Sequence, residues 1–444
     1  MIDESTPIYL QGQMAPVPDE IESFDLPVSG SIPPELNGRY VRNGPNPRAG
    51  EDPGHWFAGR GMLHGIRIRG GRAEWYRNRW VRTPNFSGEP TEPAGTPGQP
   101  AFSANTSIVR HSGRTLALEE GGLPHLIDDE LGTLGVCDFD GRLATAMTAH
   151  PKLDPVTGEL HFFGYSVMPP YLTYHRVNAA GELVETRVID VPGPTMMHDF
   201  AITANHVIWL DLPAVVDLST EGSIPIRFDE SYGARIGVMP HGRPVRWFDI
   251  DPGYVFHVGN AAEDPQGRIV LDAARYSPAS FAAIWGQVSG GTAGVEEAAD
   301  AAVERLGAYL HRWVLDPVTG TSQERQLDDR PVEFPTIRSD RTGLAARYLY
   351  AVDDKAIHKY DLRTDSTATH VLPADRIPGE AVFVPAEAAT AEDEGWLLSL
   401  DGDNAGTASR LLIIDATNPT APPVATVTLP RRVPAGFHGA WLRD

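Results

Sequence analysis

The sequence predicts an all-β protein, and among all-β architectures it favours a β-propeller. Most of the 444 residues alternate short β-branched and aromatic runs with Gly, Pro and Asp, as in NHVIWLDLP at 205–213. A turn signal recurs, because the letters DPVTG occur at both 154–158 and 316–320, with a shorter relative, DPQG, at 264–267. An antiparallel chain of this length must also protect its sheet edges, and radial blades leave only short ones.

Two segments depart from the strand pattern. GVEEAADAAVERLGAYL at 294–310 is Ala-rich with charges three or four residues apart, which predicts a helix inserted over the main body. SGEPTEPAGTPGQP at 87–100 is polar and Pro-rich, so we expect a loop. Neither resembles an interdomain linker, and residues 1–444 are predicted to form one domain. No WD or kelch signature fixes the blade number, so a pair of sandwiches stays open on pattern alone.

Composition excludes several classes of protein. Lys and Arg number 37 against 59 Asp and Glu, a net charge of −22, which repels polyanions and argues against a nucleic-acid partner. The single cysteine, Cys137, excludes an internal disulfide or a thiolate metal cluster and is expected to be a small core residue. No G-x-G-x-x-G turn or phosphate loop indicates an organic cofactor.

The sequence gives no sign of export or of a membrane span. The first thirty residues are acidic and Pro-rich, unlike a secretory signal, and no apolar stretch approaches the ~18 residues of a spanning helix. A cytoplasmic protein is therefore expected. Short apolar loops could still rest on a bilayer surface, so peripheral membrane contact stays open.

Four of the 15 histidines stand where an apolar strand ends or a Gly-rich turn begins: His150, His198, His257 and His438. They lie 48, 59 and 181 residues apart, too far for one helix or hairpin, and could meet only around the axis of a propeller. Otherwise they are ordinary strand-end residues. Six others are expected to be solvent-exposed: His55, His111, His175, His206, His358 and His370.

Imidazole ligands alone do not select among iron, zinc, copper and nickel. Metal-bound histidines usually donate their second ring N–H to a carboxylate or carbonyl, which orients the ring. Glu120, Glu333 and Glu380 each stand alone among apolar residues and are candidates for that role.

Nine motifs together resemble the carotenoid cleavage oxygenase family, which includes apocarotenoid, epoxycarotenoid and lignostilbene dioxygenases. The resemblance runs nearly end to end, and the motifs occur in the family's order. They are LNGRYVRNGPNP (36–47), HWFAGRGMLHGIRI (55–68), ALEEGGLP (117–124), TAHPKLDPVTGELHFFGY (148–165), MMHDFAIT (196–203), FHVGNA (256–261), VEFP (332–335), GEAVFVP (379–385) and GFHGAWL (436–442).

The resemblance implies a seven-bladed propeller with a dome of loops and helix over an axial non-haem Fe(II). The implied ligands are His150, His198, His257 and His438. Glu120, Glu333 and Glu380 would orient His198, His257 and His438 respectively, which leaves His150 without a carboxylate. The implied reaction uses O2 to cleave a conjugated C=C bond of an apolar apocarotenoid or carotenoid into two aldehyde or ketone products.

The substrate pocket is predicted from weaker signals. Phe102 and Thr106 are assigned to the pocket, with Thr106 facing an open iron position, and the aromatic segment 162–175 and residues 85–88 and 101–109 are expected as walls. The alternative is that these are ordinary strand residues. Lignostilbene dioxygenases carry a lysine just before the orienting glutamate, whereas this chain has Glu119, which favours carotenoids.

Three other functions stay open at this point. The first is cleavage of stilbenes or styrenyl phenols. The second is an isomerase reaction, as in some animal relatives. The third is a catalytically idle propeller that binds an apolar ligand or a protein, against which the complete set of ligand positions argues.

Overall fold

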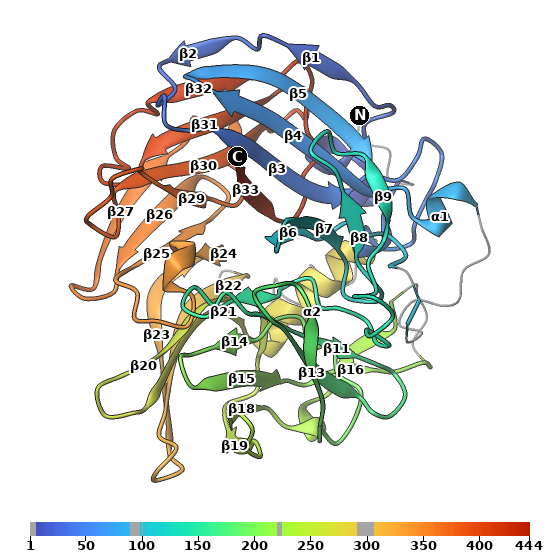
Figure 1. The fold of residues 1–444 in the computed structure, drawn as a ribbon, viewed down its shortest axis with the longest axis vertical. Helices are drawn as coiled ribbons and strands as arrows, with labels where there is room; N and C mark the ends of the chain where they lie inside the picture. Colours follow the sequence, from blue (N-terminus) through green and yellow to red (C-terminus); the bar gives the residue numbers. More distant parts are fainter. Residues whose placement is uncertain (1–5, 89–97, 100, 220–223, 291–305) are drawn as a thin grey trace.

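Seven β-sheets form a ring around a common centre, as Figure 1 shows for this computed structural model. The structure describes residues 6–88, 98–99, 101–219, 224–290 and 306–444. Within this part of the chain, each of the seven sheets has four to six antiparallel strands and is one blade of a propeller. The expected all-β, seven-bladed fold is therefore confirmed, and the sandwich alternative is excluded.

The blades are numbered here from the one that closes the ring. Blade 1 consists of β33 (Gly439–Arg443), β3 (Gly38–Pro45), β4 (Gly61–Arg69), β5 (Arg72–Trp80) and β1 (Glu22–Phe24). Blade 2 consists of β6 (Ser107–His111), β7 (Arg114–Leu118), β8 (His125–Ile127) and β9 (Thr133–Val136). Blade 3 consists of β10 (Lys152–Leu153), β11 (Leu160–Tyr165), β12 (Leu172–Val177) and β13 (Leu183–Ile189).

The other four blades follow in chain order. Blade 4 consists of β14 (Ala201–Ile202), β15 (His206–Asp211), β18 (Arg235–Pro240) and β19 (Arg246–Asp249). Blade 5 consists of β20 (Tyr254–Glu263), β21 (Ile269–Tyr276), β22 (Ala308–Leu315) and β23 (Ser322–Pro331). Blade 6 consists of β24 (Glu333–Thr336), β25 (Tyr348–Val352), β26 (Ala356–Asp361) and β27 (Ser366–Val371). Blade 7 consists of β28 (Arg376–Pro378), β29 (Val382–Pro385), β30 (Gly395–Asp403), β31 (Ser409–Asp415), β32 (Ala425–Thr428) and β2 (Val28–Gly30).

Both ends of the chain close the ring. The C-terminal strand β33 pairs with β3, with Val41 opposite Ala440, and the N-terminal strand β2 adds to β32 of blade 7. In Figure 1, β33, β6 and β24 lie near the centre, whereas β19 and β27 lie at the rim. The first strands of the blades therefore surround the axis, and residues at their starts can meet there.

The repeated turn motif forms hairpins, as the sequence predicts. Asp154 starts the turn between β10 and β11, and its carbonyl accepts a hydrogen bond from Gly158 N at 2.9 Å. Gly158 has φ of +70° and Gly320, in the second copy between β22 and β23, has φ of +80°. A left-handed backbone at these positions explains the glycine in both copies.

Hydrophobic side chains fill the spaces between neighbouring blades. Phe200 and Trp209 stack with ring centroids 5.6 Å apart, and Phe163 meets Phe200 edge-on from blade 3. Full burial of one such large side chain contributes about 1.5–3 kcal/mol. Cys137 is buried in a similar cluster between blades 2 and 3, which confirms its expected core role.

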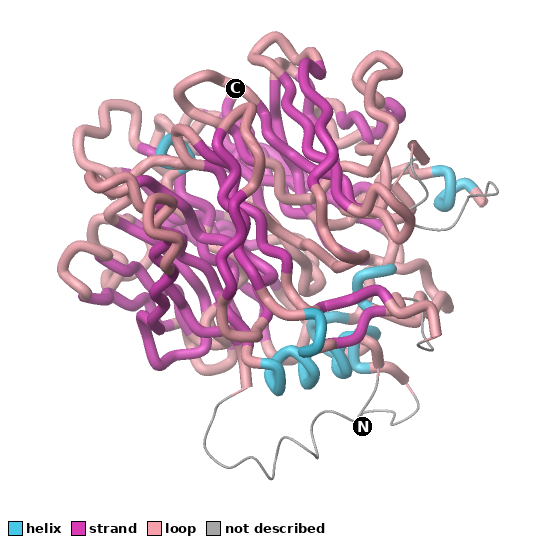
Figure 2. The backbone as a smooth tube through the Cα atoms, turned by 90° about the horizontal axis from the view of Figure 1, so that it is seen from below, coloured by secondary structure: helices cyan, strands magenta, loops and turns pink. Residues whose placement is uncertain are grey.

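Helices are few and lie outside the blades. Among the described residues they are α1 (Pro84–Ser87), α2 (Pro278–Val288) and the 3-10 turns η1 (Ile8–Leu10), η2 (Gly12–Met14), η3 (Trp56–Ala58), η4 (Glu230–Tyr232) and η5 (Ser339–Arg341). A small separate sheet joins β16 (Ala214–Val216) to β17 (Ile226–Phe228). Figure 2, turned by 90°, shows α2 on one side of the strands. No helix among the described residues combines the length and apolar composition needed to cross a membrane.

The prediction of a helix at 294–310 is wrong for the residues of this segment that the structure describes. Residues 294–305 lie outside the described ranges, and Ala308–Leu310 begin β22, with Ala308 opposite Tyr276. The observed helix is α2, just before this segment, whose N-cap Ser277 accepts a hydrogen bond from Ser280 N and is followed by Pro278. Serine followed by proline is a helix-start signal, and it explains why the helix begins here. Of the loop predicted at 87–100, residues 89–97 and 100 also lie outside.

The expectation that six histidines are solvent-exposed is also wrong for five of them. His206 is half-buried, while His55, His111, His175, His358 and His370 are buried. The polar residues around each histidine in the sequence do not reveal that the folded blades supply buried hydrogen-bond partners for the imidazole ring. His175, for example, contacts Thr145 Oγ1 at 2.7 Å and Thr186 Oγ1 at 3.0 Å.

Candidate metal centre

Seven residues, one from each blade, stand at or near the start of the strand closest to the axis. In blade order they are His438, Thr106, His150, His198, His257, Glu333 and Glu380. His257 lies within β20, Glu333 begins β24, and the others precede a short strand. The propeller therefore turns residues that are widely separated in sequence into neighbours.

The four predicted histidines form one cluster of imidazole rings. Nε2 of His150 lies 3.0 Å from Nε2 of His198, and Nε2 of His257 lies 3.1 Å from Nε2 of His438. Ring nitrogens of His150, His257 and His438 all lie within 4.8 Å of one another, a spacing that can hold a metal ion. His198 joins this group through His150, and its ring centroid lies 4.6 Å from that of His150 and 5.3 Å from that of His257.

Three of the imidazoles hydrogen-bond to the predicted glutamates. Nδ1 of His198 lies 2.8 Å from Glu120 Oε2, and Nδ1 of His257 lies 2.5 Å from Glu333 Oε2. A carboxylate only accepts, so each Nδ1 carries the hydrogen and each Nε2 presents its lone pair when the ring is neutral. The pairs link different blades, which fixes the rings relative to one another.

Glu380 makes the third pair. Its Oε1 accepts from Nδ1 of His438 at 2.9 Å, and its Oε2 accepts from the amide of Gly439 at 2.7 Å. No carboxylate of the described residues contacts His150; its amide instead donates to Thr148 Oγ1 at 3.2 Å. Each of the three glutamates thus hydrogen-bonds to one histidine of the cluster, and their role in orienting metal ligands stays a prediction.

Burial and neighbouring charges set the protonation of the cluster. Burial, together with the adjacent histidines, holds the pKa of His150 well below its ordinary value. Burial also lowers the pKa of His257 despite the Glu333 carboxylate. Burial is the largest single influence on the pKa of His198 and lowers it, but the charge and hydrogen bond of Glu120 together with the charges of Asp199 and Glu333 outweigh burial, and the net shift is upward. His150 and His257 are therefore neutral near pH 7, as metal ligands must be.

Thr106 lies beside the histidines, whereas Phe102 does not. The carbonyl of Thr106 accepts from the amide of His438 at 3.2 Å, and its hydroxyl donates to Asn105 Oδ1 at 3.0 Å. Phe102 is absent from the cavity lining described below; its amide donates to Glu119 at 3.2 Å. Phe102 therefore acts on this region only through its backbone.

A cavity of about 330 Å³ opens onto the histidine cluster. Its lining includes Thr106, His198, His257 and His438 together with Glu119 and the three orienting glutamates. Its apolar walls include Trp56, Phe57, Met196, Ile224, Phe256, Ile284, Val288, Phe334, Ile377, Pro378, Leu400, Val433, Pro434, Ala435 and Phe437. Most of these residues come from loops, η3 and α2 rather than from the blades, so the expected dome of loops and helix borders the cavity.

The predicted wall segments need correction. Of the segments 85–88, 101–109 and 162–175, only Asn105 and Thr106 line the cavity. Phe162 and Phe163 are completely buried between blades instead. Trp56, Phe57 and Phe437 line the cavity but were not predicted to do so, although they lie in the motifs HWFAGRG and GFHG. These aromatic rings pack together, with Phe57 and Phe437 centroids 5.4 Å apart.

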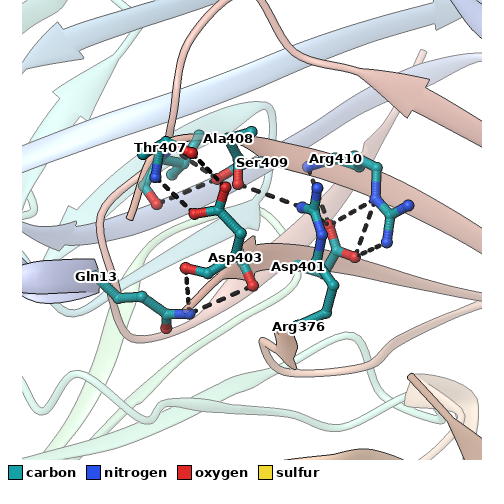
Figure 3. A network of polar contacts seen from close by, with 10 residues as sticks. Gln13, Arg376, Asp401, Asp403, Thr407, Ala408, Ser409 and Arg410 are labelled. Atoms are coloured by element: carbon teal, nitrogen blue, oxygen red, sulfur yellow. Dashed lines mark hydrogen bonds and ion pairs between the residues drawn. The ribbon is translucent and has the colours of Figure 1, made fainter. Parts of the chain in front are cut away.

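Part of the cavity lining is polar and held by ion pairs. Asp401, 1% exposed, accepts from Arg376 Nη1 at 3.3 Å and from Arg410 Nε at 3.1 Å (Figure 3). Gln13 Nε2 donates to the carbonyl of Asp403 at 2.7 Å. The Gln13 contact joins the N-terminal segment to blade 7, and the Asp401 ion pairs join β28, β30 and β31 within that blade.

Comparison with known proteins places the chain in a family. The family model described as retinal pigment epithelial membrane protein matches residues 14–443. A protein of Mycobacterium tuberculosis named carotenoid cleavage oxygenase is 37% identical, over 99% of this chain and 98% of its own length. The carotenoid 9,10(9',10')-cleavage dioxygenase 1 of Arabidopsis thaliana is 35% identical, over 100% of this chain and 91% of its own length.

Solved structures agree with this result. The cobalt-substituted apocarotenoid oxygenase of Synechocystis superposes with a TM-score of 0.83 at 28% identity, covering 97% of each chain. The protein is thus a β-propeller of the oxygenase class. It belongs to the carotenoid cleavage oxygenase family.

Proposed function

We propose that this protein is a non-haem Fe(II) dioxygenase that uses O2 to cleave a conjugated C=C bond of an apocarotenoid or carotenoid into two carbonyl products. The observation that carries the proposal is the convergence of four imidazole Nε2 atoms beside an apolar cavity. Membership of the carotenoid cleavage oxygenase family supports the carotenoid substrate.

The donor set fits a metal ion. Two Nε2 lone pairs at 3.0 or 3.1 Å repel each other unless a cation or proton lies between them. This spacing can accommodate an ion that binds both nitrogens at the usual ~2.1 Å. His150, His198, His257 and His438 would hold the ion, and the carboxylates of Glu120, Glu333 and Glu380 would offset its charge.

The chain's own residues contribute orientation and a dry environment. When bound, Fe(II) supplies electron density that lets dioxygen react with an electron-rich double bond. The three glutamates hold the ring planes, so the geometry of the centre does not need to reorganise. Trp56, Phe57 and Phe437 exclude water and select which double bond of an extended substrate lies in front of the imidazoles.

The surroundings of Glu119 favour a carotenoid over a phenolic stilbene. Its carboxylate accepts hydrogen bonds from the amides of Phe102 at 3.2 Å and Gly121 at 2.8 Å, so both of its oxygens are engaged by backbone donors. Burial raises the pKa of Glu119 to about 7. A group of this kind cannot supply the positive charge that stabilises a bound phenolate.

The proposal is tested with iron-loaded protein under O2. Apocarotenals, carotenoids and hydroxystilbenes are each incubated, and the products are identified by mass spectrometry. We expect two carbonyl fragments from an apocarotenal or carotenoid, labelled when ¹⁸O₂ is used. Cleavage of stilbenes alone would replace the substrate class, and a product of unchanged formula would indicate an isomerase. If the protein takes up no iron, the alternative of a propeller that only binds an apolar ligand or a protein is favoured instead.

A further inference from the structure

The carboxylate of Asp199 contacts three of the segments that carry the histidines. Its side chain follows His198 directly and is 2% exposed. Oδ1 pairs with Lys152 Nζ at 2.7 Å, and Oδ2 accepts from the amide of Val258 at 2.8 Å. Lys152 lies two residues after His150, and Val258 follows His257. One side chain therefore joins the His150, His198 and His257 segments.

These segments lack regular strand pairing where the histidines stand. His150 precedes β10, which has two residues, and His198 precedes β14, which also has two. The pairing register of β20 shifts on both sides of Val258, next to His257. Strand hydrogen bonds therefore do not fix these backbones, and a shared acceptor supplies the missing constraint.

The ion pair suits this task because it is largely buried. The Lys152 side chain is 17% exposed, and Asp199 Oδ1 also accepts from the amide of Phe200 at 2.7 Å. A buried carboxylate with charged and amide donors forms strong, directional hydrogen bonds. Removing one partner leaves the other charge or amide unsatisfied, which is costly in a buried place.

We infer that Asp199 is a positioning residue that sets the spacing of the metal-binding imidazoles by holding three of their four backbones. The inference rests on the proposed function, since it assumes that the imidazoles bind a metal. Asp199 need not touch the metal. It constrains the His150 segment through Lys152 and the His257 segment through Val258. It constrains His198 directly, because the two residues are adjacent in the chain.

The test measures cobalt(II) affinity of the purified full-length chain, using chelator competition and visible absorption. Asp199→Asn keeps the shape but replaces one acceptor oxygen with an NH2 group, which cannot accept from Lys152 or Val258. We expect cobalt affinity to fall about 10–100-fold, the effect usual for groups that support metal ligands, and the cobalt absorption bands to change. Lys152→Met should give a smaller loss, and Lys152→Arg should retain most of the affinity.

Asp211→Asn is the matched control. Asp211 is also buried and pairs with Arg235 at 2.8 Å, but it lies on β15 and contacts none of the four histidines. It should lower thermal stability without changing the cobalt spectrum. If Asp199→Asn binds cobalt as tightly as the unaltered chain and with the same spectrum, the inference is overturned. If the unaltered chain binds no cobalt or iron, the proposed function fails instead.

Discussion

The pair between Glu380 and His438 allows a quantitative prediction about the metal centre. Glu380 is 8% exposed and accepts two hydrogen bonds, from His438 Nδ1 at 2.9 Å and from Gly439 N at 2.7 Å. In Glu380→Gln the amide oxygen can serve only one of these donors, and the NH2 group faces the other. The change thus removes the charge and leaves one buried donor unpaired.

The expected size follows from these two losses. A hydrogen bond to a charged group contributes ~1.5–3 kcal/mol and a neutral one ~0.5–1.5 kcal/mol, so the exchange costs about 1–1.5 kcal/mol before the unpaired donor is counted. Supporting carboxylates typically change metal affinity by 10–100-fold, or about 1.4–2.7 kcal/mol. We therefore expect Glu380→Gln to raise the Kd for Fe(II) or Co(II) about 10–100-fold.

The assay is anaerobic competition against a chelator of known affinity. Glu324→Gln is a closely matched control, because Glu324 also accepts from one histidine, His311 Nε2 at 3.0 Å, and from one amide, Asp251 N at 3.1 Å. That pair lies in the β22–β23 region, away from the four histidines. Equal affinity in Glu380→Gln and the unaltered chain, or an equal loss in both variants, would refute the reasoning.

Three further predictions concern the same region. His257→Ala should abolish metal binding, measured by metal analysis after dialysis, because it removes one donor and leaves the Glu333 carboxylate without its histidine partner. The pKa of Glu119 is about 7 in the folded protein and 4.5 ordinarily, so between these pH values the native state binds more protons than the unfolded state. The free energy of unfolding should therefore fall as pH rises from 4.5 to 7. Glu119→Gln should remove this pH dependence. Urea unfolding at several pH values should show this fall only in the unaltered chain. Ile284→Trp should narrow the cavity and raise KM for long substrates while the Kd for Co(II) stays unchanged, and a changed Kd would contradict the assignment of Ile284 to the wall.

The sequence by itself determined the fold class and the residues at the centre. Strand and turn patterns follow from local chemistry, so Asp154–Gly158 predicts its hairpin without knowledge of the rest of the chain. The histidines stood out at strand ends and the glutamates among apolar residues, and the resemblance of nine motifs to the family then implied their roles. Local sequence also misled at the end of the helix predicted at 294–310, because residues 308–310 belong to β22 and pair with β21.

Only the tertiary structure decided which residues meet. Closure of the ring by β33 on β3 brings His438 within 3.1 Å of His257, although 181 residues separate them. Blade packing also buries five histidines whose sequence contexts are polar, and it builds the cavity wall from η3, α2 and Phe437 rather than from the predicted aromatic segment. These outcomes depend on long-range contacts around the axis, and the residue pattern of a single strand does not predict such contacts.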